Sequence, residues 1–464
     1  MKSEYPFVSI IIVNYNGAHY LPTCLDALRL QTYPQDFFEV FVSDNGSSDG
    51  SIELVKNDYP WVRLLDNRHN LGFAAGNNVA IQVARGEFII LLNNDTLPTP
   101  SWLENMVRVA NQYDRAGIIT GHLQLFYDQV KFSFKADAFS PQGDPRSLGV
   151  QIFRVDSGAE RGIVQYLDGF YGEERNENGE RFRWSQTEGV VGIPVPSGEG
   201  DWNLHLAIAA QNNSRGEVRF RLFTEDLQVC EIEVIGGDVQ YHDIQLPKIV
   251  RQSKIPLEQN TGSIIFRNGT TRDRGTYVVN NELFFEEDEG QYGSIEEVFA
   301  GCGASMLIKR ETLEQIGLFD DDLFMYYEDT DISWRARLCG WRVYYAPDAV
   351  VRHIHCGTTK EWSPHFLYLT ERNRLAMVFK NGSPRQVLKV WGGYLWRVSL
   401  SGWNVVRLLS TSNPIWRVRA SELRIHLKVL TKLLVWLPVL FQKRHAIRTS
   451  STVEYHQIES WFFE

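Results

Sequence analysis

The first 120 residues alternate between two hydrophobic periods. Four apolar runs predict strands at residues 7–13, 40–43, 62–65 and 88–92, and the first, a continuous run with β-branched residues, predicts a strand buried on both faces. Apolar residues recur at helical spacing in the segments between and after them: 21–28, 52–55, 73–84 and 100–113. This alternation predicts a doubly wound α/β domain with a mostly parallel sheet.

The pattern changes near residue 140. Short segments of alternating apolar and polar residues, separated by turn-forming stretches, continue to about Leu257 and predict an all-β sandwich. Apolar α/β character returns near Val298, so the sandwich is expected to be an insert. After about Asn381 the chain predicts helices rich in Leu, Val, Trp and Arg. The expected domains are the first α/β half, the insert, the second α/β half and a helical region: 1–138, 139–257, 258–380 and 381–464.

Charge separates the last part of the chain from the rest. The whole sequence has a net charge of -10, yet the segment from Arg372 to Arg448 contains fifteen Lys and Arg residues against one acidic residue, Glu422. Tryptophans accompany these cations, as at Trp396 and Trp403, and a basic surface with tryptophan is typical of a helix lying on anionic lipid. Helical packing against the rest of the protein or a second subunit explains the same pattern equally well.

The sequence also predicts a cellular location. Its five cysteines are scattered without a Cys-x-x-Cys pair, which favours reduced thiols in an intracellular protein. We find no signal peptide at the N-terminus and no run of about 18 apolar residues that would span a bilayer. We therefore expect a cytoplasmic protein, with the basic region as a peripheral contact with the inner face of the plasma membrane.

Polar side chains follow three of the predicted strands. In an open parallel sheet, ligands bind beyond the carboxyl ends of the strands, so these side chains are expected to lie at one site. The three strand ends read Asn14-Tyr-Asn16-Gly, Asp44-Asn45-Gly-Ser-Ser-Asp-Gly and Asn93-Asn94-Asp95-Thr.

Six segments in order resemble the family-2 glycosyltransferases. They are VSIIIVNYNG, VSDNGSSDGS, NLGFAAGNN, LLNNDT, GCGASMLIKRETLEQIGLFD and FMYYEDTDISWRARLCGWRVYYAPDAVVRHIH. The likeness covers roughly residues 5–130 and 260–380, leaves the β-rich insert out, and is strongest to rhamnosyltransferase-type members. It implies a GT-A fold, a nucleotide-diphospho sugar donor and inversion at the anomeric carbon.

The resemblance implies a divalent metal, Mn²⁺ or Mg²⁺, at Asp95. This residue occupies the last position of the family's Asp-x-Asp-like motif, whose first position is Asn93 here. His353 is placed like a family histidine that reaches the metal or the diphosphate. The neighbouring His355 and Cys356 alone are weak evidence for zinc. As alternatives, NNDT is a turn with a helix cap, and His353 is a structural hydrogen-bonding residue at a strand end.

A larger set of residues is expected to bind the donor: Asn14, Asn16, Asp44, Asn45, Gly72, Gly76, Asn77, Asn94 and Arg372. By resemblance, Asp44 contacts the nucleobase or ribose; otherwise it caps the following helix. The glycines allow close approach to the donor, or tight helix packing. Arg372 and its neighbour Arg374 contact the diphosphate, or they begin the basic region.

Transfer to a hydroxyl group requires a base, and a positioned carboxylate supplies one. Glu328-Asp329-Thr-Asp331 matches the family's Glu-Asp motif at the start of a helix. We expect Asp329 to be the base and Glu328 to support it or bind the acceptor, while Asp331 faces elsewhere. The alternative is a run of acids favoured by a helix N-terminus.

In the insert, Tyr171 and Trp184 are candidates for stacking on carbohydrate, or else belong to its core. The overall hypothesis is an inverting glycosyltransferase that adds a sugar, with rhamnose the leading candidate, to a growing glycan or lipid-linked glycan in cell-surface polysaccharide synthesis. Homo-oligomers are compatible with it, and no nucleic-acid motif is present. The rival hypothesis is a non-catalytic carbohydrate-binding or scaffold protein that keeps the GT-A fold; Asn93 and the insert motivate it.

Overall fold

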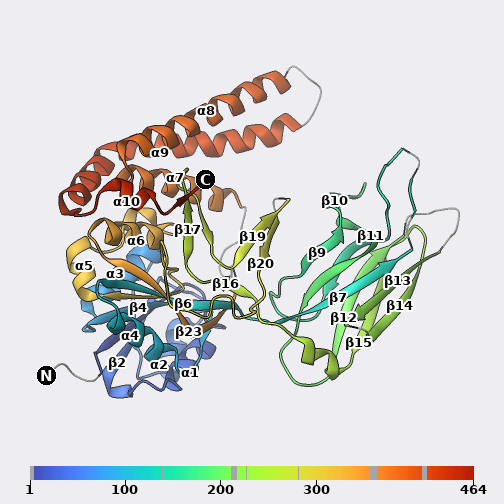
Figure 1. Cartoon of the computed structure of the whole chain (residues 1–464), viewed down its shortest axis with the longest axis horizontal. Helices are drawn as coiled ribbons and strands as arrows, with labels where there is room; N and C mark the ends of the chain where they lie inside the picture. Colours follow the sequence, from blue (N-terminus) through green and yellow to red (C-terminus); the bar gives the residue numbers. More distant parts are fainter. Residues whose placement is uncertain are drawn as a thin grey trace. The chain divides into compact units, whose positions relative to one another are not determined.

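The computed structural model (Figure 1) describes residues 5–137, 139–141, 143–210, 217–225, 227–280, 282–355, 363–409 and 415–464. The chain divides into two compact units. The α/β unit comprises Met1–Leu123, Asn260–Arg274 and Tyr292–Glu464, and the β unit comprises Gln124–Gln259 and Gly275–Gln291.

The α/β unit is built on one mixed sheet. Its main path has the order β21-β23-β6-β22-β4-β1-β2-β3. The parallel part comprises β1 (Val8–Asn14), β2 (Phe38–Asp44), β3 (Arg63–Asp66) and β4 (Phe88–Leu92). The other strands are β5 (Thr96–Pro98), β6 (Ala116–Leu125), β21 (Glu296–Glu297), β22 (Ser305–Lys309) and β23 (Arg342–His353). Because β22 runs antiparallel to β4, the parallel order predicted for the first half ends there.

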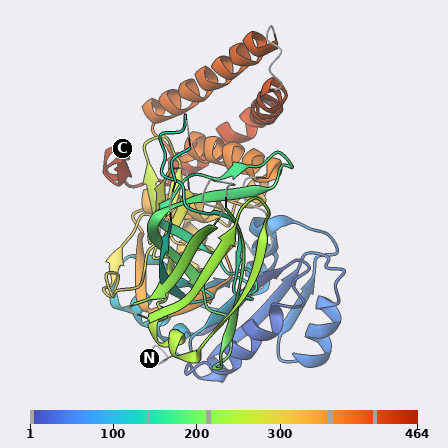
Figure 2. The same cartoon turned by 90° about the vertical axis from the view of Figure 1, so that its right-hand side faces the viewer.

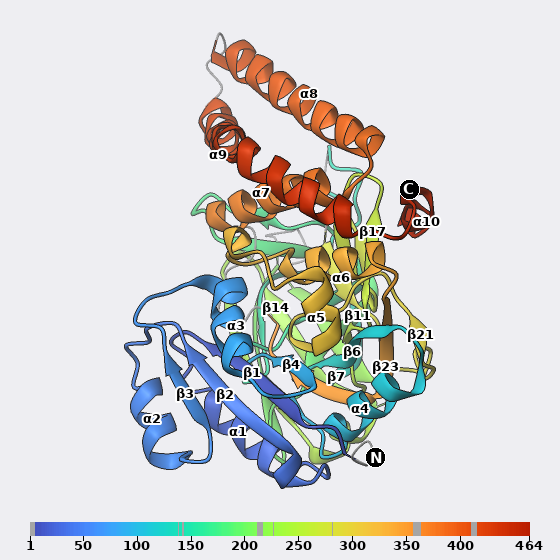
Figure 3. The ribbon, with the colours of Figure 1, turned by 90° about the vertical axis from the view of Figure 1, so that its left-hand side faces the viewer.

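Helices cover both faces of this sheet, as continuous apolar strands require. Side chains alternate along β1, so Ile10 packs in the core with α1 (Leu21–Arg29) and α4 (Trp102–Gln112). Ile11 points to the opposite core, against α3 (Gly72–Val83), α5 (Arg310–Ile316) and α6 (Glu328–Leu338). Helix α2 (Ser51–Asp58) connects β2 to β3 (Figure 3).

The C-terminal part of this unit is helical. It comprises α7 (Pro364–Asn381), α8 (Pro384–Leu409), α9 (Ile415–Ser450) and α10 (Tyr455–Glu459). Apolar residues of α7, α8 and α9 form a core with the side of α6 that carries Trp334 and Leu338. A small sheet of β17 (Ser263–Phe266), β18 (Thr271–Asp273) and β24 (Phe462–Phe463) adjoins it. Among the described residues, no helix is both long and apolar enough to cross a membrane.

The β unit is an extended antiparallel sheet rolled around its own core, drawn mainly in green in Figures 1 and 2. Its strands are β7 (Gln129–Ala136), β8 (Gln151–Asp156), β9 (Gln165–Phe170), β10 (Glu174–Arg175), β11 (Arg181–Pro194), β12 (Trp202–Ala209), β13 (Glu217–Thr224), β14 (Leu227–Ile235) and β15 (Gln240–Leu246). The hairpin of β19 (Thr276–Val279) and β20 (Glu282–Phe285) belongs to the same unit, and β16 spans Glu258–Asn260.

The observed limits of the β unit differ from the expected insert at 139–257. Strand β7 lies before residue 139, yet it pairs with β11 and β13, so it is part of the rolled sheet. Its alternating exposed and buried residues are visible in the sequence at Lys131 to Ala136. The hairpin at 276–285 follows a return to the α/β unit, and no local pattern separates it from that unit.

Candidate active site

The carboxyl ends of β1, β2 and β4 are joined by buried side chains. Nδ2 of Asn14 donates to Oδ2 of Asp44 at 2.8 Å, and Nδ2 of Asn94 donates to Oδ1 of Asn14 at 2.7 Å. Asn14 and Asp44 are adjacent because they are paired in the β1–β2 register. The three predicted strand ends therefore meet, as the parallel order of these strands requires.

Asp44 organises the loop after β2. Its carboxylate accepts hydrogen bonds from the backbone N–H of Ser47 at 2.7 Å and from the Ser47 hydroxyl at 2.8 Å. Asn16 joins the same loop, because its side-chain oxygen accepts from the N–H of Ser48 at 2.8 Å. Helix α2 begins only at Ser51 and has no side-chain cap, so Asp44 does not cap it. The fully buried carboxylate of Asp44 is placed to shape this loop.

The first turn of α3 is held against a second loop. Gly72 has φ +83°, and a Cβ there would lie 2.5 Å from Phe324, which only glycine avoids. Nδ2 of Asn45 donates to the carbonyl of Gly72 at 3.0 Å. A Cβ on Gly76 would meet Val13 at 3.0 Å, so Gly76 serves tight helix packing.

Asn77 is also on α3. It is fully buried, and its Nδ2 donates to the Phe73 carbonyl at 2.9 Å. Its Oδ1 has no hydrogen-bond donor among the described residues. A buried amide oxygen that accepts no hydrogen bond costs free energy. A bound ligand with an N–H or O–H group could supply the missing hydrogen bond to Oδ1 of Asn77.

Asp95 and His353 lie side by side because β5 pairs with β23. Thr96 is paired with His353 in the register, and the N–H of Ile354 donates to the Asp95 carbonyl at 3.1 Å. Nε2 of His353 lies 3.2 Å from Oδ1 of Asp95 and 3.3 Å from Nδ2 of Asn93. Helix α4 starts at Trp102 after Ser101, so Asp95 is not its cap.

The donor set at this pair fits a divalent cation. Asp95 is buried, and its Oδ1 receives no hydrogen bond from the described residues, although it is close enough to His353 for an ion pair. A carboxylate oxygen and an imidazole nitrogen on adjacent strands offer two ligand atoms of the kinds that such cations accept. The neighbouring Cys356 lies outside the described residues.

Helix α6 begins with the two predicted acids after a strained loop. Phe324, Tyr326 and Tyr327 have φ values of 65°, 72° and 68°. Such left-handed backbone costs each non-glycine residue about 1 kcal/mol or more and is concentrated at functional sites. Asp329 follows directly; its Oδ2 accepts from the N–H of Gly303 at 3.2 Å, and its Oδ1 accepts from the N–H of Thr330 at 2.6 Å.

Burial raises the pKa of both acids. Glu328 is 6% exposed, and its Oε2 has no hydrogen-bond donor among the described residues. Burial, together with the adjacent Asp329 charge, raises the pKa of Glu328 well above its ordinary value. Burial likewise raises the pKa of Asp329, against the opposing hydrogen bonds from Gly303 and Thr330. A carboxylate with a raised pKa is a stronger base than an exposed aspartate.

Replacing Glu328 with Gln is expected to stabilise the fold in a pH-dependent way. Because the folded pKa of Glu328 is raised, ionising it opposes folding at pH values above its unfolded pKa of about 4.3. The gain in the free energy of unfolding should be full above the folded pKa and shrink as the pH falls towards 4.3. Urea unfolding at pH 5 and pH 8 measures it, with the exposed Glu53→Gln as control. An equal gain at both pH values would contradict the prediction.

Asp331 turns away from this pair into a buried charge network. Its carboxylate contacts Nε of Arg335 at 3.0 Å and Nζ of Lys380 at 2.8 Å. Lys380 also contacts Asp320, which in turn contacts Lys443 of α9. Although burial alone would raise it, Lys380 and Arg335 hold the pKa of Asp331 below its ordinary value. The network therefore ties the start of α6 to α7 and α9.

The two arginines considered for the diphosphate are committed to neighbouring backbone. Arg372 donates to the carbonyl of Leu323 at 2.8 Å. Arg374 donates to the carbonyl of Asn268 at 2.6 Å and pairs with Glu371. Arg372 therefore supports the loop at 323–327 that leads into α6. The residue type alone did not distinguish this role from contact with a phosphate.

Asn373, between those arginines, was not predicted. It is fully buried, and its Nδ2 donates to the carbonyls of Leu323, Met325 and Tyr326, each at 2.8 Å. One side chain thus holds the backbone that turns into Glu328. Asn373 lies in the segment ERNRL (371–375), but the loop that its side chain holds is about 50 residues earlier in the chain.

Two family models match the chain. The model described as Glycosyl transferase family 2 matches residues 9–169, and the model described as Glycosyltransferase like family 2 matches residues 275–377. The chain belongs to the family-2 glycosyltransferases. Its α/β unit has the GT-A fold that this membership implies.

One curated relative of this family-2 chain and two solved structures that resemble it are as follows. Glycosyltransferase AglE of Haloferax volcanii is 38% identical over 110 residues, which cover 23% of this chain and 36% of AglE. The chain spans about a third of the length of the curated relatives that it matches first. The mannosyltransferase PcManGT of Pyrobaculum calidifontis, solved with GDP-Man and Mn²⁺, is 13% identical with a TM-score of 0.40, covering 97% of this chain and 86% of its own. GalNAc-T7, solved with UDP, GalNAc and Mn²⁺, is 12% identical with a TM-score of 0.46. The match covers 94% of this chain and 58% of the GalNAc-T7 chain.

In this family-2 chain, a further acid close to Asp329 is Asp273 on β18, which the sequence did not predict. Nδ2 of Asn260 donates to its Oδ1 at 2.7 Å. Burial raises the pKa of Asp273 to about 6, with the charges of His355 and His353 opposing and that of Asp329 adding to the shift. Asp273 is therefore within electrostatic range of Asp329 and of His353, two of the predicted site residues. A single acid in TTRDRG carries no signal that could have identified it.

In the β unit, Trp184 is part of a small core. It is 5% exposed and packs edge-on against Phe139 and Phe182. Of the two alternatives for Trp184, the structure supports the core. Tyr171 is half-buried, donates to the Ser147 carbonyl at 3.2 Å and lies under the Arg146 guanidinium.

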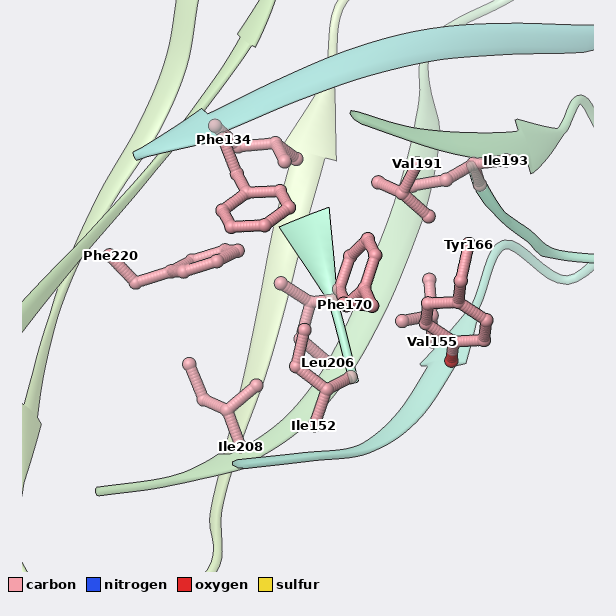
Figure 4. Close-up of a pocket in the computed structure, with 11 residues that line it drawn as sticks. Phe134, Ile152, Val155, Tyr166, Phe170, Val191, Ile193, Leu206, Ile208 and Phe220 are labelled. Atoms are coloured by element: carbon pink, nitrogen blue, oxygen red, sulfur yellow. The ribbon is translucent and has the colours of Figure 1, made fainter. Parts of the chain in front are cut away.

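One cavity inside the β unit is too small and too apolar to bind a sugar. Figure 4 shows aromatic and aliphatic side chains, among them Phe134, Phe170 and Leu206, pointing into it. Its free space is about 10 Å³, at most enough for a single water molecule, and its lining is apolar. It is a packing gap in the core of the unit.

Proposed function

We propose that this protein is an inverting glycosyltransferase in which Asp329 deprotonates the acceptor hydroxyl. The observation that carries the proposal is the proximity of a buried acid pair and a metal-ligand pair. Gly303 donates its N–H to Asp329, and the carbonyl of the next residue, Ala304, accepts from the N–H of Asn93 at 3.1 Å. Asp95 is two residues beyond Asn93, so the two pairs flank the same short segment.

Asp329 would remove the hydroxyl proton as the acceptor oxygen attacks the anomeric carbon. The bond from that carbon to the diphosphate oxygen breaks, the nucleoside diphosphate leaves, and a single displacement inverts the configuration. The raised pKa of Asp329 strengthens it as a base, and the adjacent Glu328 would support it or bind the acceptor. Asp273 lies within range to adjust the charge at this site.

Asp95 and His353 would hold the divalent cation. When bound, the cation neutralises charge that develops on the leaving diphosphate. A site with an imidazole nitrogen beside a carboxylate favours Mn²⁺ over Mg²⁺, which prefers oxygen ligands. Asn93 leaves one carboxylate in the motif, so we expect binding of the cation to depend on the donor's phosphates.

Asn77, with its uncompensated Oδ1, and the loop shaped by Asn14, Asn16 and Asp44 would receive the donor. We propose dTDP-rhamnose as the first donor to test, on the resemblance to rhamnosyltransferase-type members, and UDP-sugars next. The acceptor would be a growing glycan, lipid-linked in cell-surface polysaccharide synthesis. We place the reaction in the cytoplasm, at the inner face of the plasma membrane.

Calorimetric titration of a panel of nucleotide sugars, with and without Mn²⁺, tests the proposal. We expect one donor to bind in a metal-dependent way and Asp95→Ala to weaken it at least tenfold, because the variant lacks the only carboxylate of the motif. Asp58→Ala, which removes an exposed acid on α2, is the matched control.

The titration also separates the proposal from its rival. If no donor binds to the folded protein, the non-catalytic scaffold becomes the better explanation. Asn93 in place of an acid is the observation that favours that rival. Donor binding that is unaffected by Mn²⁺ and by Asp95→Ala would remove the metal from the mechanism.

A further inference from the structure

Helix α8 has two apolar faces, and only one of them is covered. Val390, Tyr394 and Val398 are buried in the core with α7 and α9. The opposite face exposes large apolar side chains: Leu388, Leu395, Trp396, Trp403 and Val406, which are 76%, 48%, 66%, 68% and 62% exposed. A helix that is apolar all round is normally buried. The exposed face of α8 therefore lacks a partner among the described residues.

Helix α9, which runs antiparallel beside α8 in Figures 1 and 3, repeats this arrangement. Val429, Leu433 and Leu440 are buried. Leu427, Leu434 and Phe441, spaced seven residues apart, are 49%, 64% and 59% exposed. We call the two helices together the α8–α9 arm.

The exposed apolar faces of the arm are accompanied by positive charge. Helix α8 contains four basic residues and no acidic one, and α9 contains eight basic residues and one acidic residue, Glu422. The rest of the chain is acidic, because the whole has a net charge of -10. The combination of apolar faces and local positive charge selects a partner that is both apolar and anionic.

A groove between the two helices concentrates these charges. It has a volume of about 590 Å³ and is lined by Arg397, Arg407 and Arg419 together with Leu400 and Ile415. Glu422 pairs with Arg419 at 3.0 Å, and Glu371 lies 3.5 Å from Arg397. Three guanidinium groups against one lining carboxylate leave the groove positive, which suits the phosphate groups of lipids.

We propose that the α8–α9 arm docks on an anionic phospholipid bilayer. The exposed Leu and Phe side chains would enter the acyl boundary, Trp396 and Trp403 would lie at headgroup level, and the basic residues would face the phosphates. A nucleic acid would match the charge but not the apolar faces. The proposal goes beyond the proposed reaction, since binding to lipid requires neither donor nor turnover.

Vesicle flotation of the full chain tests the docking. We expect binding to vesicles with 30% phosphatidylglycerol and much weaker binding to phosphatidylcholine alone. Trp396→Ser with Trp403→Ser should weaken binding to anionic vesicles at least tenfold. Arg397→Gln, Arg407→Gln and Arg419→Gln together should weaken it roughly a hundredfold at low salt, because each cation near the surface is worth about a factor of five.

Matched controls change the same chemistry elsewhere. Tyr241→Ser removes a side chain that is 80% exposed in the β unit. Arg154→Gln, Arg181→Gln and Arg219→Gln remove three exposed cations of that unit. Retained binding in both controls supports the arm as the docking surface. Failure of the folded wild-type protein to float with anionic vesicles would overturn the proposal, as would a dimer in light scattering that the Trp variant dissociates, since a second copy would then cover this face.

Discussion

The variant Asp329→Asn is expected to bind the donor normally and to lose turnover by about 10²- to 10⁴-fold, the range that a positioned general base supplies. Asparagine preserves the shape and can still accept from the N–H of Gly303, but it cannot take the acceptor proton. Steady-state transfer assays and donor titration measure the two effects separately. Because the pKa of Asp329 is raised, wild-type kcat/KM should fall with decreasing pH at pH values above the ordinary titration of aspartate near 3.9.

The control for this variant is Asp58→Asn, which changes an exposed acid on α2 and should leave turnover and its pH profile unchanged. Near-normal transfer by Asp329→Asn would exclude Asp329 as the base. A residual rate that still follows the same acid limb would assign the base to Asp273, whose pKa is about 6.

Lys380→Met is expected to lower the free energy of unfolding by about 3–5 kcal/mol, the usual cost of removing one partner from a buried ion pair. Lys380 is 1% exposed and lies between Asp320 and Asp331. Its removal leaves Asp331 paired with Arg335 alone and Asp320 with Lys443 alone. Urea unfolding followed by circular dichroism measures the loss.

The exposed Lys389→Met makes the same change on α8 and should shift stability by less than about 0.5 kcal/mol. Adding Asp331→Asn to Lys380→Met should recover part of the loss, because it removes a buried charge that has lost one of its two ionic partners. A Lys380→Met protein as stable as the wild type would contradict the prediction, and a double variant that recovers none of the loss would show that the two charges are not coupled.

Three strands of the parallel half of the sheet, β1, β2 and β4, were predictable because they are buried on both faces. Such burial produces continuous apolar runs, and β1, β2 and β4 all appear as runs of this kind in the sequence. The limits of the β unit were not predictable to the same degree. A strand such as β7 alternates like any half-buried strand, and only its pairing with β11 assigns it to a unit.

The positions of the candidate site residues were predictable where those residues are neighbours in a motif. Glu328 and Asp329 stand at the start of a helix, as the motif implied, and Asp95 lies beside His353. The roles of other residues depend on partners far along the chain. Asn373 and Arg372 hold a loop about 50 residues away, and Asp273 approaches Asp329 through a different part of the fold.

The aromatic residues with left-handed backbone before α6 imply that thermal stability and turnover would be in conflict in engineered variants. Glycine at Phe324 or Tyr326 would relieve backbone strain. It would also remove the contact of Phe324 with Gly72 or the edge-on packing of Tyr326 against Phe366 at 5.0 Å. Selection for thermal stability alone would therefore favour substitutions at these positions that relieve backbone strain. The same substitutions would hold the loop before Asp329 less firmly and so let the position of its carboxylate vary.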